Sequence, residues 1–125
     1  MTPSRRRALI LALTVSAVSA PALAHHSFGM FDAQKSVTLE GAVKAFEWTN
    51  PHVWIEIAVT DSKGATVDWA VEGASAAVLS RQGWSRKAMK PGDKVSILIH
   101  PAKDGTAGGS LVSATVNGKP VGSHG

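Results

Sequence analysis

Hydrophobic and polar residues alternate along much of the chain, which is the period of half-buried β-strands. In the first half, the alternation predicts strands at residues 37–45, 53–59 and 67–71. Residues 61–64 between the last two strands are typical of a hairpin turn. Gly41, inside the first strand, predicts a bulge or a bend. We therefore expect the three strands to form a meander.

The period changes after the third strand, where we expect a short helix. Ser75 is a suitable N-cap for a helix over residues 76–82, and residues 84–90 are expected to add a further helical turn. Alternation returns at residues 95–99 and again at 111–116. These two segments predict a fourth and a fifth strand.

Three strands, a helix and two strands follow one another in the same order as in the oligonucleotide/oligosaccharide-binding (OB) fold. We expect a mainly β protein, a small five-stranded OB-like barrel over residues 37–118. An N-terminal arm over 25–36 precedes the barrel, and a mobile tail over 119–125 follows it. An open sheet with one helix packed on it is the alternative. Closure removes exposed strand edges, which favours the barrel.

The first 24 residues have the pattern of a cleavable signal peptide. Residues 5–7 are a positive cluster, residues 8–20 are apolar, and Ala22-Leu23-Ala24 is an A-x-A cleavage site. We expect cleavage after Ala24 and a periplasmic or secreted product. The arginine cluster also resembles a twin-arginine signal, so both export routes stay open, with the general secretory route favoured.

Export changes the charge of the chain. The 125 residues carry 13 Lys and Arg against 9 Asp and Glu. Loss of the signal removes three arginines and leaves a nearly neutral product, which gives no support to a nucleic-acid partner. No other apolar run approaches the roughly 20 residues that span a bilayer, so we expect a protein that does not cross the membrane. The chain has no cysteine, which excludes disulfides, thiolate metal sites and thiol nucleophiles.

Histidines carry the most informative chemistry. Cleavage after Ala24 would give His25 a free α-amine, with His26 next to it. An α-amine and its own imidazole can chelate one metal ion, and the imidazole of His26 can join the amine through the intervening amide nitrogen. Copper favours such nitrogen-rich sets. The amine must lose its proton, and its ordinary pKa of about 7.7–8.0 makes that accessible when a metal competes.

Two further histidines are placed by the predicted barrel. His52 follows the first strand and His100 ends the fourth, and the corresponding loops of an OB barrel flank its binding face at one end. A nearly extended arm is long enough to bring His25 and His26 back along the first strand to them. We predict that these four histidines bind a metal ion, and their nitrogen donors favour copper. A purely structural role for His52 and His100 stays open.

Tryptophans suggest another function. Trp48 and Trp54 straddle the loop that holds His52, and Asn50 lies between them. Indole rings there can cover a ligand or stack against it. The alternative function is therefore a non-catalytic binding module for a periplasmic partner protein or a small ligand. We expect no enzymatic activity, since no set of catalytic residues stands out.

Five short motifs span nearly all of the expected mature chain: His25-His26-Ser27-Phe28, Phe46-Glu47-Trp48-Thr49-Asn50-Pro51-His52, Gln82-Gly83-Trp84, Lys90-Pro91-Gly92-Asp93 and Gly108-Gly109-Ser110-Leu111. Together they resemble an uncharacterised family of small exported bacterial proteins, a domain of unknown function. The resemblance implies export and a single β-rich domain, and it implies no activity. At the level of the fold alone, the chain is also similar to small periplasmic copper chaperones built on an OB barrel. Their ligand motif is not matched here, so no residue is carried over.

Overall fold

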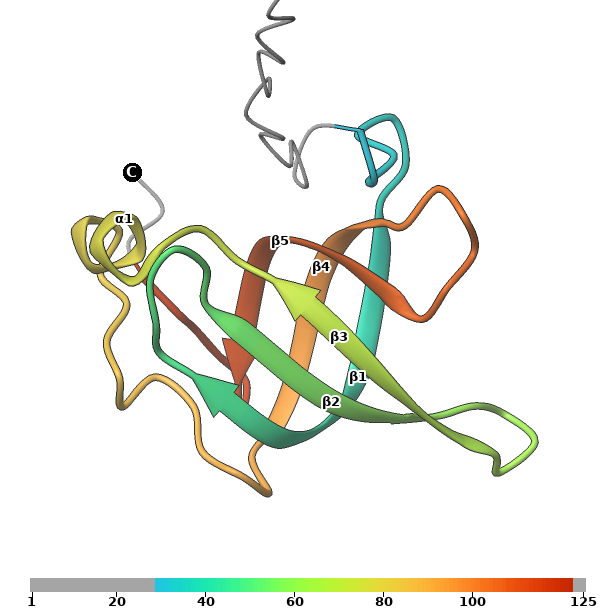
Figure 1. Cartoon of the computed structure of the whole chain (residues 1–125). Coiled ribbons are helices and arrows are strands. Elements are labelled where there is room, and N and C mark those ends of the chain that lie inside the picture. Colours follow the sequence, from blue (N-terminus) through green and yellow to red (C-terminus); the bar gives the residue numbers. More distant parts are fainter. Residues whose placement is uncertain (1–28, 123–125) are drawn as a thin grey trace, which may run out of the picture.

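The computed structural model of the chain describes residues 29–122. The elements of this range, in chain order, are β1 (Val37–Glu47), β2 (Trp54–Thr60), β3 (Thr66–Glu72), α1 (Ala76–Arg81), β4 (Lys94–Pro101), β5 (Gly108–Val116) and β6 (Lys119–Pro120) (Figure 1). They form one sheet in the order β3-β2-β1-β4-β5-β6. A further pairing of β3 with β5 closes the sheet. The expected five-stranded OB-like barrel is confirmed, and the open sheet is excluded.

Strand β1 is shared between the two halves of the barrel. Its first half, residues 37–42, pairs with β4, and its second half, residues 42–47, pairs with β2, both antiparallel. Residues 70–72 of β3 pair in parallel with residues 108–110 of β5. Because β1 bends round the barrel to serve two partners, its two ends face different neighbours.

The predicted alternation accounts for the core. One face of each strand is buried and the other faces outward, as period-two patterning requires. Trp54 lies on the outer face of β2 and is 40% exposed. Val67 is also exposed, because the β2–β3 hairpin extends beyond the barrel (Figure 1). The largest fully buried side chains are Val53, Ile55, Ile57, Val71, Ile97 and Ile99.

Helix α1 has the predicted cap but not the predicted extension. The Ser75 hydroxyl accepts a hydrogen bond from the Val78 amide at 3.1 Å. Gly83 then takes a φ of +84° and ends the helical path. Residues 84–90 form turns rather than a helical turn, because Trp84 and Met89 are both buried and residues five apart lie on different faces of a helix. No helix within residues 29–122 is long and apolar enough to cross a membrane.

Two features differ from expectation: the place of the irregularity in β1 and the C-terminal end of the barrel. The irregularity in β1 lies between Val43 and Ala45 rather than at Gly41. Residues 119–122 do not begin a free tail: β6 pairs with β5, and the Val121 amide donates a hydrogen bond to the Ala114 carbonyl at 2.9 Å. The barrel domain therefore extends past residue 118, and residues 123–125 lie outside the described range.

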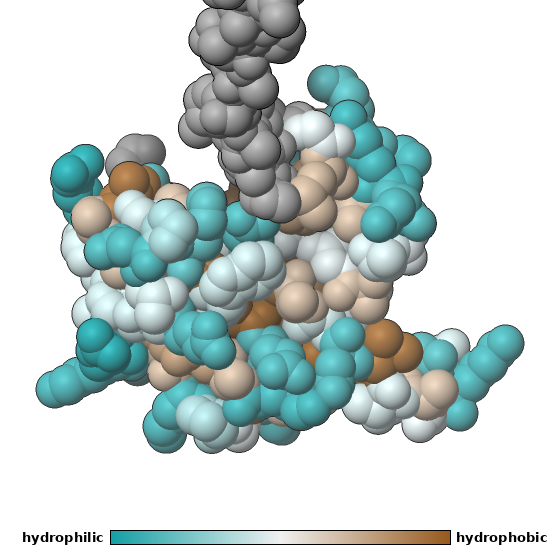
Figure 2. Space-filling view, in the orientation of Figure 1, coloured by the Kyte–Doolittle hydropathy of each residue, from teal (hydrophilic) through white to brown (hydrophobic). Residues whose placement is uncertain are grey.

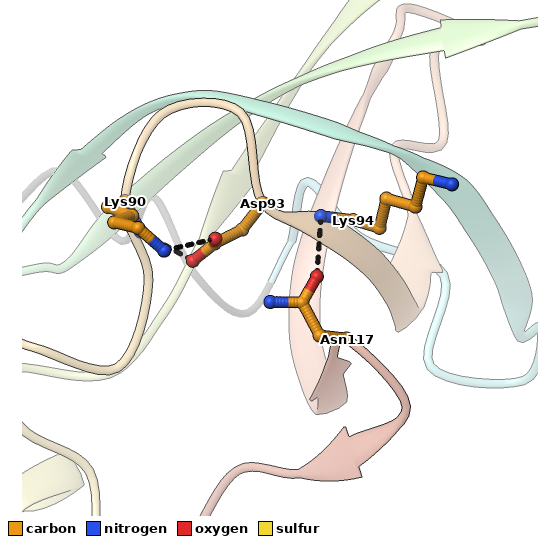
Figure 3. A network of polar contacts seen from close by, with 4 residues as sticks. All are labelled: Lys90, Asp93, Lys94 and Asn117. Atoms are coloured by element: carbon orange, nitrogen blue, oxygen red, sulfur yellow. Dashed lines mark hydrogen bonds and ion pairs between the residues drawn. The ribbon is translucent and has the colours of Figure 1, made fainter.

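The turn that precedes β4 is held by a buried carboxylate. Asp93 is 8% exposed and accepts hydrogen bonds from the amide of Lys90 at 3.0 Å and from its ammonium at 2.6 Å (Figure 3). Next to it, the Lys94 amide donates to the side-chain oxygen of Asn117 at 3.3 Å. The hydrogen bond from the Lys90 side chain holds the pKa of Asp93 below its ordinary value of 3.8. The ionised carboxylate thus stabilises the turn.

This geometry predicts how stability responds to acid. A carboxyl whose pKa is lowered in the folded state stabilises the fold above its unfolded pKa, and that contribution is lost as pH falls through the folded pKa. We expect Asp93→Asn to lower the melting temperature at pH 7 and to flatten its decline below about pH 4. Melting curves between pH 2 and pH 7 test this. If the melting temperatures of the parent and of Asp93→Asn fell by the same amount between pH 7 and pH 2, Asp93 would not contribute to the loss of stability in acid.

Candidate metal site

A buried carboxylate lies beside one of the predicted histidine ligands. The His52 Nδ1 atom is 3.4 Å from Oε1 of Glu72, and His52 is about one-third exposed whereas Glu72 is 7% exposed. Glu72 ends β3 and His52 lies in the loop between β1 and β2. The alternation of residues along β3 places Glu72 on the outward-facing side of the strand, yet its side chain is buried. Phe31 and His52 line the hollow beside it.

The hydrogen bond of His52 decides its tautomer. Its Nδ1 atom lies 3.1 Å from the carbonyl oxygen of Gly73. A carbonyl only accepts, so Nδ1 carries the proton and donates it. In the neutral ring, Nε2 then keeps its lone pair. In a metal-binding histidine, the ring nitrogen that does not bind the metal commonly donates a hydrogen bond to a carbonyl or a carboxylate. The Nδ1 atom of His52 lies near one group of each kind.

His100 is oriented in the same way. Its Nδ1 atom lies 2.7 Å from the Lys35 carbonyl oxygen, so Nδ1 again donates and Nε2 is left with its lone pair. His100 is aligned with Ser110 of β5, and Ser110 is aligned with Glu72 of β3. At roughly 4.8 Å per strand, the Cα atoms of His100 and Glu72 are roughly 10 Å apart.

The N-terminal arm takes a shorter path than expected. Val37 pairs with Ile99, so β1 begins beside His100 and not at the opposite end of the barrel. Phe31 forms an isolated bridge with Ala102, and the Asp32 amide donates to the Pro101 carbonyl at 2.8 Å. The arm therefore already lies against the β4–β5 connection and need not run back along β1.

Phe31 brings the arm to His52. It lines a hollow of about 260 Å³ together with His52, Glu72, Gly73, Ala74, Ser110 and Leu111. The predicted ligands His25 and His26 lie outside the described residues. Six residues of chain, from His25 to Phe31, span at most about 20 Å. This length is sufficient to reach His52.

The described residues do not by themselves form a metal site. Within residues 29–122 no three His, Asp or Glu side chains are grouped closely enough to hold a metal ion. The structure brings His52 and Glu72 together and leaves His100 two strands away. Glu72 is the residue that sequence reasoning missed as a neighbour of His52. Its signal lies in the strand register, which aligns Trp54 with Glu72 and Glu72 with Ser110.

The three residues predicted to form a ligand-binding face, Trp48, Asn50 and Trp54, differ in their surroundings. Trp48 is partly buried against the core and packs on Phe46, with ring centroids 6.0 Å apart. The side-chain oxygen of Asn50 accepts a hydrogen bond from the Ala77 amide at the start of α1, at 3.3 Å. Both residues thus have structural contacts. Trp54 alone presents a large exposed aromatic surface, on the outer face of β2.

Comparison with known proteins places the chain in a family without assigning an activity. No curated protein and no solved structure matches it significantly. The model of a family of unknown function, DUF6152, matches residues 12–112, so the resemblance to an uncharacterised family is confirmed. The chain therefore belongs to this family of unknown function.

Proposed function

We propose that this protein is an exported, periplasmic metal-binding domain whose cleaved N-terminus and His52 hold one copper ion. Cleavage after Ala24 supplies the α-amine and the imidazoles of His25 and His26, and His52 supplies a further imidazole through Nε2. The observation that carries the proposal is the orientation of His52. Its Nδ1 proton is held by the Gly73 carbonyl beside the buried Glu72 carboxylate.

Glu72 acts on the metal through His52. A carboxylate near the distal ring nitrogen fixes the ring and raises the basicity of the ligating nitrogen. With a negative charge 3.4 Å from Nδ1, the imidazole becomes a better electron donor at Nε2. Burial of Glu72 strengthens this interaction, because the local dielectric constant is lower than that of water.

The donor set favours copper over other divalent ions. The chain offers imidazole and amine nitrogens and no thiolate, and such nitrogen sets bind Cu²⁺ most tightly among the first-row divalent metals. His100 has the same free Nε2 but lies roughly two strand spacings from Glu72. We therefore assign His100 a smaller contribution than His52.

Competition titration with Cu²⁺ tests the role of the N-terminus. The protein starting at His25 is compared with the same protein acetylated at its α-amine. Acetylation removes the amine as a ligand but keeps every side chain. We expect roughly 100-fold weaker copper binding in the acetylated form, because the chelate at residue 25 is lost. Equal affinities would exclude the N-terminal amine as a ligand, and preference for Zn²⁺ would overturn the choice of copper.

A further inference from the structure

A second hollow lies on the outer face of the barrel, beside the exposed Trp54. Neighbouring strands align Glu47, Trp54 and Glu72 in one row. The next row aligns Ala45, Glu56 and Ala70. Because the two alanines are small, they leave a hollow of about 380 Å³ next to the indole, with Glu47, Glu56 and Asp68 also among its lining residues.

The charge of this hollow is negative. Lys44 pairs with Asp68 and, at 3.4 Å, with Glu56. The hydrogen bond to Asp68 raises the pKa of Lys44 above its ordinary 10.5, so Lys44 is an ammonium ion at neutral pH. One ammonium thus pairs with two of the three carboxylates, and Glu47 has no cationic partner among residues 29–122. An aromatic ring flanked by surplus carboxylates attracts a cation.

The hollow continues past the indole. Trp54 and Ala70 also line an adjacent hollow of about 360 Å³ between the arm and the β4–β5 connection. That second hollow is bordered by the exposed side chain of Met30 and by the glycines at the start of β5. A free small cation would occupy only the acidic part. An extended polypeptide would occupy both parts, with an apolar side chain on the second.

The surface around the Trp54 hollow is suited to a small interface with a partner. Strands β2 and β3 cross the front of the barrel in Figure 1, and Figure 2 shows this face with small apolar areas separated by hydrophilic side chains. A broad apolar interface is therefore absent from this view. Recognition would depend on one anchoring side chain and the few contacts around it.

We propose that the Trp54 hollow binds an arginine side chain of an extended partner segment, with a neighbouring apolar residue placed toward Met30. Arginine fits better than lysine, because its planar guanidinium stacks on an indole and pairs with a carboxylate through two hydrogen bonds. Trp54 provides the stacking face and Glu47 the unpaired carboxylate. This surface borders the proposed copper site, since Phe31 and Glu72 line both the hollow beside His52 and the hollow beside Met30, but it uses none of the proposed copper ligands.

NMR titration of the metal-free protein, with EDTA present, tests the proposal. The probe is the blocked peptide acetyl-Ala-Arg-Leu-Ala-amide, and the comparison peptide has citrulline, which is neutral and of nearly the same shape, in place of arginine. We expect the arginine peptide to shift the indole signal of Trp54 and the amide signal of Glu47. The citrulline peptide should bind about tenfold more weakly.

Variants of the protein locate the contact. Glu47→Gln is expected to weaken binding of the arginine peptide about fivefold, and Trp54→Ala to abolish the specific shifts. Glu40→Gln is the matched control, since Glu40 lies on the other half of β1 and accepts a hydrogen bond from Ser96. The proposal is overturned by equal binding of both peptides, by an unchanged affinity in Glu47→Gln, or by arginine amide binding as tightly as the peptide.

Discussion

Replacement of Gly41 by alanine is expected to lower the free energy of unfolding by about 3 kcal/mol. A Cβ atom at this position would lie 2.2 Å from the carbonyl oxygen and 3.0 Å from the carbonyl carbon of Ala58. Both are backbone atoms of β2, and β2 is fixed by its pairing with β1 and β3. The clash is therefore relieved only by separating strands where β1 passes from one partner to the other.

Thermal denaturation of Gly41→Ala measures this effect. A loss of this size corresponds to a fall in melting temperature of roughly 10–20 °C for a domain of this length. Gly29→Ala is the control, because a Cβ there meets no atom within 4 Å. Its stability should stay within about 0.5 kcal/mol of the parent. An unchanged melting temperature for Gly41→Ala would mean that the two strands are not this close.

Replacement of His52 by alanine is expected to weaken copper binding by roughly 10- to 100-fold. The variant loses the imidazole whose Nδ1 atom donates to the Gly73 carbonyl beside the Glu72 carboxylate. Glu72→Gln should have a smaller effect in the same direction, since the ring remains but loses the adjacent negative charge. Competition titration of the processed proteins with Cu²⁺ measures both affinities.

His100→Ala is the matched control for this experiment. It removes a histidine with the same hydrogen-bond pattern, at a position roughly two strand spacings from Glu72. We expect its copper affinity to fall less than that of His52→Ala. Melting curves without metal separate loss of binding from loss of folding. If copper affinity fell more in His100→Ala than in His52→Ala, the copper ion would be bound by His100 rather than by His52.

Much of the fold could be predicted because its determinants are local. The alternation of apolar residues such as Ile55, Ile57 and Ile97 specified the strands and their buried faces. Ser75 marked the start of α1 through its capping side chain. The order of the elements was then sufficient to predict the barrel.

The candidate site was only partly predictable, because it depends on non-local pairing. Phe31 lines the same hollow as the buried Glu72 although it lies about forty residues away along the chain, and no local pattern encodes that proximity. The position of His100 depends on the bend of β1 between its two partners. Gly41 predicted a bulge or a bend: the bulge lies elsewhere, and the glycine stands where β1 passes between its two partners and accommodates the close approach of Ala58.

Pulsed EPR of the Cu²⁺-loaded processed protein tests the central claim most directly, because it detects each imidazole bound to the ion through its remote nitrogen. Spectra of the parent protein and of His52→Ala are compared at one copper equivalent. We predict that the parent spectrum contains one more imidazole contribution than the His52→Ala spectrum. Identical spectra would contradict the claim that His52 and the N-terminus share one copper ion.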